Sequence, residues 1–171
     1  LSQALPARLE VGDIHLGGGS PNMLSVEELD IIFAGLRQVF DVAADAEIAA
    51  ELDPAVLSGD WIAAAARHGL SRASLGVQNL APEVQKAVNR QERFEEIADC
   101  VEALRAAGVA SINLDLMYGL PHQTTRNTLS TLDAVLTLRP ERLALFGYAH
   151  VPWMKAHQQL IDEAALPGPA E

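Results

Sequence analysis

Short apolar runs alternate with longer amphipathic segments along the whole chain, and this alternation predicts strands separated by helices. Successive runs begin about 26 to 39 residues apart, roughly the length of one strand-plus-helix unit. Several runs are apolar on both faces, as strands are when both faces of a parallel sheet are buried. The five expected strands lie in "DIHLGG" (13–18), "AEIAAELDP" (46–54), "RASLGVQ" (72–78), "SINLDLMYGLP" (111–121) and "RLALFGYAH" (142–150).

The segments between these runs have the 3.6-residue periodicity of helices. Ser25 and Glu28 stand three residues apart before the first of them, which predicts a capping box. Gly69, Gly108 and Pro140 stand where the later helices are expected to end. The expected apolar faces are Leu29, Ile32, Phe33, Leu36 and Phe40; Phe94, Ile97, Val101 and Leu104; and Leu129, Leu132, Val135 and Leu136. The remaining helix is expected in "WIAAAARHGL" (61–70).

Uninterrupted alternation of strands and helices predicts an α/β fold with a parallel sheet in one domain. A doubly wound sheet and a (β/α) barrel both fit this periodicity. A complete eight-fold barrel needs roughly 250 residues. Five units in 171 residues therefore make a partial, TIM-like barrel if the barrel is the correct alternative.

Composition and charge exclude several classes of protein. The net charge of −11 and the pI near 4.8 argue against nucleic-acid binding and against attraction to anionic membranes. No apolar run is long enough to span a bilayer, and the first residues lack the pattern of a signal peptide. Cys100 is the single cysteine, so an internal disulfide is impossible and a reducing, cytoplasmic location is expected.

Polar groups stand at the carboxyl end of every expected strand, where parallel α/β folds bind their ligands. Five polar strand ends at one edge of a sheet favour a ligand site over a merely polar rim. In chain order, these groups are Gly17, Gly18, Gly19 and Ser20; Glu51 and Asp53; Gln78 and Asn79; Asp115, Tyr118 and Gly119; and Tyr148 and His150.

Three consecutive glycines allow a ligand to approach the backbone closely. The run does not match a dinucleotide fingerprint, because Asn22 stands where a small residue is needed, and no P-loop lysine is near. Glu51 suits a ligand cation, whereas Asp53 precedes a proline and is expected to cap the next turn. The histidines lack zinc-ligand spacing. Cys100 is expected to be buried or half-buried within a helix.

Six stretches, taken in order, resemble the radical S-adenosylmethionine (SAM) superfamily and, more narrowly, the oxygen-independent coproporphyrinogen III oxidases. They are "GGGSP" (17–21), "EIAAELDP" (47–54), "SLGVQ" (74–78), "VNR" (88–90), "NLDLMYGLP" (113–121) and "YAHVP" (148–152). The resemblance extends from about residue 13 to the end. It favours the barrel, with residues 1–171 as the central part of a radical SAM barrel domain. The cluster-binding N-terminal segment and the C-terminal region that covers the substrate are then expected outside this chain.

The resemblance also implies roles for eight residues. Gly18 and Glu51 match positions that contact the catalytic SAM. Ser20 stands where threonine is more usual and keeps the hydroxyl group. Glu51 would offset an ammonium group, Arg90 would pair with a carboxylate, and Asp115 would accept from hydroxyl or amine donors. The positions that contact a second SAM are matched by Gly19, Ser20, Gln78, Arg90, Asp115 and Ala149.

The reaction implied is the oxidative decarboxylation of two propionates of coproporphyrinogen III to vinyl groups, in porphyrin and haem biosynthesis without oxygen. In this family a [4Fe–4S] cluster reduces SAM, and the 5′-deoxyadenosyl radical removes a propionate hydrogen. The cluster motif C-x-x-x-C-x-x-C is absent from this sequence, and Cys100 alone cannot hold a cluster. The chain by itself is therefore expected to be inactive, and its metal ligands are expected elsewhere. The porphyrinogen is the expected partner, with no nucleic acid and no membrane.

Two alternatives remain open at this point. Haem-trafficking relatives share the barrel and deliver haem, but they are expected to differ at Arg90 and Ala149. A plain α/β domain that binds another small amine or nucleotide, without radical chemistry, also fits the periodicity.

Overall fold

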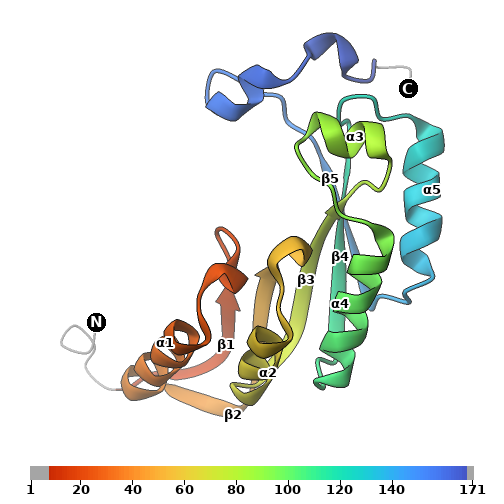
Figure 1. The fold of residues 1–171 in the computed structure, drawn as a ribbon. Coiled ribbons are helices and arrows are strands. Elements are labelled where there is room, and N and C mark those ends of the chain that lie inside the picture. The colour runs from red at the N-terminus through yellow and green to blue at the C-terminus, as the bar shows by residue number, and fades with distance from the viewer. Residues whose placement is uncertain (1–7, 169–171) are drawn as a thin grey trace.

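The computed structural model describes residues 8–168, and within that range five parallel strands form one curved sheet in the order β1-β2-β3-β4-β5. The strands are β1 (Glu10–Leu16), β2 (Asp41–Leu52), β3 (Leu70–Gln78), β4 (Ser111–Tyr118) and β5 (Arg142–Gly147). Each strand pairs with its chain neighbour. The sheet curls into a half-barrel, which confirms the expected α/β class and the partial (β/α) barrel (Figure 1).

The helices between the strands lie along the outer, convex side of the sheet, except for the short helix at 82–87, which lies near the carboxyl ends of the strands (Figure 1). They are α1 (Val26–Val39), α2 (Gly59–Arg67), α3 (Pro82–Ala87), α4 (Phe94–Ala106) and α5 (Thr125–Leu136). Short 3-10 turns are η1 (Pro21–Met23), η2 (Pro54–Val56), η3 (Ala156–Leu160) and η4 (Glu163–Ala165). Within residues 8–168, none of the helices has the length and apolar character that crossing a membrane requires.

Local signals in the sequence set the ends of these helices. Ser25 and Glu28 form the expected capping box at the start of α1, with both reciprocal hydrogen bonds present. Gly69 and Gly108 follow α2 and α4 with φ of 98° and 91°, a left-handed conformation that glycine adopts readily. Asp53 caps η2 by accepting a hydrogen bond from the Ala55 N–H, as expected.

The prediction of the apolar helix faces is wrong in part. Ile32 is 36% exposed, and Leu129 and Leu136 of α5 are 53% and 48% exposed. Phe40 caps α1 and does not belong to its last turn. In α5 only one edge of the predicted stripe packs on the sheet, because Val135 is fully buried and Leu132 is partly buried. Periodicity alone does not reveal how wide a face the neighbouring elements cover.

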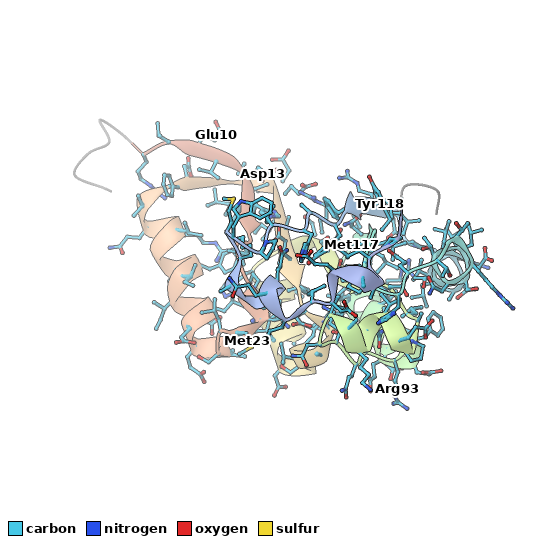
Figure 2. All side chains as sticks on the ribbon, turned by 90° about the horizontal axis from the view of Figure 1, so that it is seen from above. Glu10, Asp13, Met23, Arg93, Met117 and Tyr118 are labelled. Atoms are coloured by element: carbon cyan, nitrogen blue, oxygen red, sulfur yellow. The ribbon has the colours of Figure 1, made fainter. Side chains whose placement is uncertain are left out.

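The core lies between the sheet and the helices. Alternate residues of β3 and β4 point into it, including Leu75, Val77, Ile112 and Leu114, all fully buried. The residues between them are polar and half-exposed, and they line the inner, concave face. Figure 2, seen from above the strand ends, shows the sheet curving from Asp13 of β1 round to Met117 of β4.

After β5 the chain crosses above the carboxyl ends of the strands (Figure 1). Gln158 fixes this segment: its side chain accepts a hydrogen bond from the Val151 N–H at 2.6 Å and donates one to the Ala149 oxygen at 3.0 Å. His122, in the loop after β4, donates its backbone N–H to the Ala165 oxygen at 2.7 Å. The concave face therefore opens toward a rim that the C-terminal segment partly covers.

Candidate functional site

Glu51 and the glycine run meet at the carboxyl ends of β1 and β2. Glu51 Oε1 lies 3.2 Å from His15 Nε2, and its Oε2 accepts from the Gly18 N–H at 3.4 Å. A Cβ added at Gly17 would lie 2.9 Å from His15 Nε2 and 3.1 Å from the Glu51 carboxyl carbon. Gly17 therefore makes room for the His15–Glu51 pair. Gly18, at φ 85°, turns the backbone so that its N–H reaches the carboxylate.

Gly19 and Ser20 follow in the same loop and make fewer contacts. A Cβ at Gly19 would meet nothing within 4 Å, so this backbone faces open space. The Ser20 side chain makes no capping hydrogen bond, although its carbonyl oxygen accepts from the Met23 N–H at 2.9 Å. Both residues remain accessible to a ligand that enters the loop, and neither touches the pocket described below.

Asp115 belongs to a closed cluster of three polar side chains on the concave face. Ser74 Oγ donates to Asp115 Oδ2 at 2.8 Å, and Asn113 Nδ2 lies 2.6 Å from Asp115 Oδ1. Asn113 Nδ2 also lies 2.6 Å from Ser74 Oγ. Both carboxylate oxygens are therefore held by neutral donors. Each oxygen retains a second acceptor position for a ligand, because a carboxylate accepts at about four lone-pair sites.

Gln78 and Arg90 meet above Gly76, beside Asp115 in the sheet register. Arg90 Nη1 donates to the Gly76 oxygen at 2.8 Å. A Cβ at Gly76 would lie 3.0 Å from Gln78 Nε2 and 3.6 Å from both terminal nitrogens of Arg90. The bare backbone at Gly76 thus lets an amide and a guanidinium share one spot on the concave face.

The conformation of Gln78 is itself unusual. Its φ of 62° is rare for a residue with a side chain, and the β3–β4 register shifts between Gly76 and Gln78. Gln78 Oε1 is buried and has no hydrogen-bond partner among the described residues. Strained backbone and unpaired buried acceptors cost free energy and concentrate at functional sites. The Gln78 amide is thus available for a ligand donor.

A pocket of about 810 Å³ opens at this place. Gln78, Arg90 and Ala149 line it together with Met117 and Leu160, so three strands and the C-terminal segment contribute to its wall. Of the eight residues expected to contact SAM, the structure therefore gathers three in one pocket, places Asp115 beside it, and pairs Gly18 with Glu51 farther along the same rim.

Arg72, near the amino end of β3, and His150, near the carboxyl strand ends, are already paired. Arg72 Nη2 lies 2.7 Å from Glu47 Oε1, and its Nε donates to the same oxygen at 2.9 Å. His150 Nε2 lies 3.1 Å from Glu163 Oε1, and its Nδ1 lies 3.2 Å from the Tyr148 hydroxyl. Burial raises the pKa of Tyr148, which keeps this phenol protonated at neutral pH.

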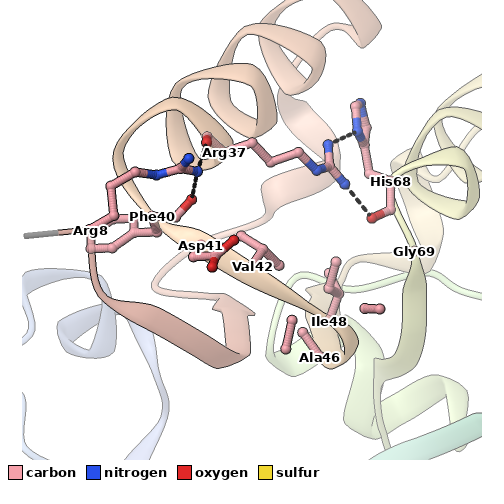
Figure 3. A pocket seen from close by; sticks show the side chains of 11 residues that line it. Arg8, Arg37, Phe40, Asp41, Val42, Ala46, Ile48, His68 and Gly69 are labelled. Atoms are coloured by element: carbon pink, nitrogen blue, oxygen red, sulfur yellow. Dashed lines mark hydrogen bonds between the residues drawn. The ribbon is translucent and has the colours of Figure 1, made fainter.

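A second cavity of about 400 Å³ lies at the opposite end of the sheet, near the starts of β2 and β3 (Figure 3). Its cations are engaged by the fold. Arg8 Nη2 donates to the Arg37 and Phe40 oxygens, which caps the end of α1. Arg37 donates to His68 Nδ1 at 3.0 Å and to the His68 oxygen at 2.9 Å. These contacts make it a structural junction.

The described residues offer no site for an iron–sulfur cluster. Residues 8–168 contain no group of three or more histidine, cysteine or acidic side chains placed to hold a metal. Cys100 lies half-buried in α4, as expected, with its Sγ 3.8 Å from the Pro54 oxygen. Burial raises the pKa of this thiol and so disfavours the thiolate that binds metals.

Several residues of the site were missed by the sequence analysis. Ser74 and Asn113 share a face with Gln78 and Asp115, so the two-residue alternation of β3 and β4 was the signal that identifies them. His15 likewise stands two residues before Gly17. Nothing in the sequence pattern distinguishes Glu92, whose carboxylate is buried beside Arg90.

Comparison with known proteins agrees with this geometry. A model of the radical SAM superfamily matches residues 2–135. The oxygen-independent coproporphyrinogen III oxidase of Bradyrhizobium diazoefficiens is 47% identical over 171 residues, which cover 99% of this chain and 38% of the relative. The protein of the same name from Helicobacter pylori J99 is 42% identical and is covered to 38%. This chain thus spans less than two fifths of these relatives.

Solved structures show the same architecture. Coproporphyrinogen III oxidase (HemN) from Escherichia coli, a radical SAM enzyme, matches with a TM-score of 0.91 and 40% identity over 94% of this chain and 37% of that one. The radical SAM methyltransferase TsrM from Kitasatospora setae matches with a TM-score of 0.67 at 15% identity, over 82% of this chain and 28% of that one, which shows a shared fold. From the half-barrel and the superfamily match, we conclude that this chain belongs to the radical SAM superfamily.

Proposed function

We propose that the intact protein carries out the oxygen-independent oxidative decarboxylation of coproporphyrinogen III to protoporphyrinogen IX, and that this chain supplies its SAM-binding rim. The names of the relatives at 42–47% identity support the reaction. The observation that carries the proposal is the meeting of Gln78 and Arg90 above Gly76, in a pocket that Ala149 also lines. The single cysteine fits a reducing, cytoplasmic compartment.

The residues at the rim fit the two ends of an amino acid. The Glu51 carboxylate lies beside the glycine loop at 17–19 and suits an ammonium group. Arg90 retains Nη2 for a carboxylate, because both of its contacts among residues 8–168 use Nη1. Asp115 and Gln78 have spare acceptor positions for hydroxyl or amine donors. SAM carries all of these groups, so the donors and acceptors present fit two SAM molecules along one rim.

Bound SAM supplies the hydrogen-abstraction chemistry, and the protein holds it in place and excludes water. The [4Fe–4S] cluster of this family does not fit the residues described, since they provide no set of three cysteines. Its ligands belong to another part of the intact protein. The substrate's carboxylates meet a rim on which His150 is already paired with Glu163, whereas Arg90 keeps Nη2 without a contact among residues 8–168.

Anaerobic turnover of coproporphyrinogen III by the intact protein, with SAM and a reductant, tests the proposal. Formation of protoporphyrinogen IX is the expected result. The matched experiment is a haem titration, because a haem-trafficking protein would bind haem stoichiometrically and leave the porphyrinogen unchanged. That outcome would replace the oxidase with its haem-binding relative.

Arg90→Ala in the intact protein is expected to abolish turnover, because it removes the guanidinium that pairs with a carboxylate in the pocket. Arg93→Ala is the matched control: Arg93 is an exposed arginine at the start of α4, on the helix side of the sheet (Figure 2). If the Arg90 variant turned over substrate at the rate of the unmodified protein, the proposal that this pocket binds a second SAM molecule would be wrong.

A further inference from the structure

Glu92 is a buried carboxylate in the turn between α3 and α4. Its side chain is 6% exposed, and acidic residues are seldom this buried unless they are paired. Gln85 fixes the turn around it. Its side-chain Nε2 donates to the backbone carbonyl oxygen of Glu92 at 2.8 Å and to that of Asn79 at 3.1 Å. The Arg90 N–H in turn donates to the Gln85 oxygen at 2.8 Å. The fold thus holds Glu92 and Arg90 in one rigid loop.

Keeping Glu92 charged costs free energy, because Arg90 is the one cation among the described groups that shift its pKa. Burial raises the pKa of its carboxyl, and the guanidinium of Arg90 opposes that rise. The other charged groups that act on it, Asp53 and Glu96, are acidic and raise it further. Glu92 Oε2 is buried and has no hydrogen-bond partner among the described residues. A carboxylate placed in this way weakens the fold, so its contact with Arg90 calls for an explanation.

The contact places Arg90 between a carboxylate and a backbone carbonyl oxygen. Nη1 lies 3.5 Å from Glu92 Oε1 and 2.8 Å from the Gly76 oxygen, which it bonds. The two oxygens flank the same nitrogen, one through an ion pair and one through a hydrogen bond, so together they direct the guanidinium across Gly76. Arg90 lines the pocket together with Gln78 and Ala149, and the two contacts above both use Nη1 and leave Nη2 for a ligand.

We propose that Glu92 is a positioning residue for Arg90: it holds the guanidinium over Gly76 so that the remaining donors stay directed at a ligand carboxylate. This inference rests on the proposed function, in which the Arg90 pocket binds SAM. Glu92 itself does not touch the ligand. An amide at position 92 would keep a polar oxygen near Nη1 without the charge of the ion pair, whereas an alkyl side chain of similar size would lose both.

The test measures the dissociation constant for SAM at this pocket by isothermal titration calorimetry, on the intact protein. Glu92→Leu is expected to weaken binding about tenfold, because the half-buried guanidinium loses the ion pair that directs it. Glu92→Gln is expected to bind with an affinity between those of Glu92→Leu and the unmodified protein, because it keeps the polar oxygen but loses the charge. If the charge of Glu92 instead merely neutralised Arg90, both variants would bind SAM more tightly, and the proposal would be wrong.

A double-mutant cycle separates positioning from a general effect on the fold. In an Arg90→Ala background, Glu92→Leu is expected to cause no further loss of affinity, because the group it positions is gone. An equal loss in both backgrounds would contradict the proposal. The proposed function fails separately: if Arg90→Ala alone leaves SAM affinity unchanged, the pocket does not bind SAM through Arg90, whatever Glu92 does.

Discussion

At this rim, two glycines matter for the space that they leave, as much as other residues matter for the groups that they carry. Gly17 and Gly76 each lack a Cβ where one would meet functional side chains, at 2.9 Å from His15 Nε2 and 3.0 Å from Gln78 Nε2. In both cases the nearest atom is the far end of a flexible side chain. A methyl group would therefore displace the site while the backbone stayed in place.

Gly17→Ala is expected to separate His15 from Glu51 and to weaken SAM binding at the Glu51 end of the rim about tenfold, the loss of one charge-assisted hydrogen bond. Its melting temperature should change little. Gly12→Ala is the matched control, because Gly12 lies in β1, the strand that leads to Gly17, and a Cβ there would meet nothing within 4 Å. Calorimetric titration with SAM and a thermal melt check both expectations. Unchanged affinity in the Gly17 variant would mean that the His15–Glu51 pair does not contribute to binding.

At the scale of elements, the sequence predicts best where a local contact defines the structure. The Ser25–Glu28 capping box and the left-handed glycines after α2 and α4 are confirmed because each depends on neighbours in the chain. The exposed Leu129 and Leu136 were predicted wrongly because the cover of a helix depends on elements distant in sequence. Glu92 was missed for the same reason. Its ion pair with Arg90 gains a role only where the fold brings Arg90 over Gly76 of β3, and Gly76 is distant in sequence.

Ser25→Ala removes the side-chain oxygen that accepts from the Glu28 N–H at the start of α1. We expect the free energy of unfolding to fall by about 1 kcal/mol, the usual cost of losing an N-cap. Ser130→Ala, an exposed serine inside α5, should cost nothing, because alanine has the higher helix propensity. Urea denaturation of the two variants measures the difference. Equal stabilities would show that α1 is held by packing alone.

At the scale of the whole molecule, a parallel half-barrel brings five strand ends to one rim, so residues as far apart in sequence as Gly18 and Ala149 lie along it. The order of polar strand ends along the sequence was enough to predict that rim, and the resemblance named the ligand. The sequence could not show which of these residues share a pocket. That depends on the register of β3 against β4, on the left-handed turn at Gln78 and on the crossing of the C-terminal segment.

The number of SAM molecules bound per chain tests the central claim most directly, because the claim is that one rim holds two. Equilibrium dialysis of the intact protein, with its cluster reconstituted under anaerobic conditions, gives that number. We expect two molecules for the unmodified protein and one for Arg90→Ala, whose loss should be confined to the pocket shared by Gln78 and Ala149. One molecule bound by both proteins would contradict the account.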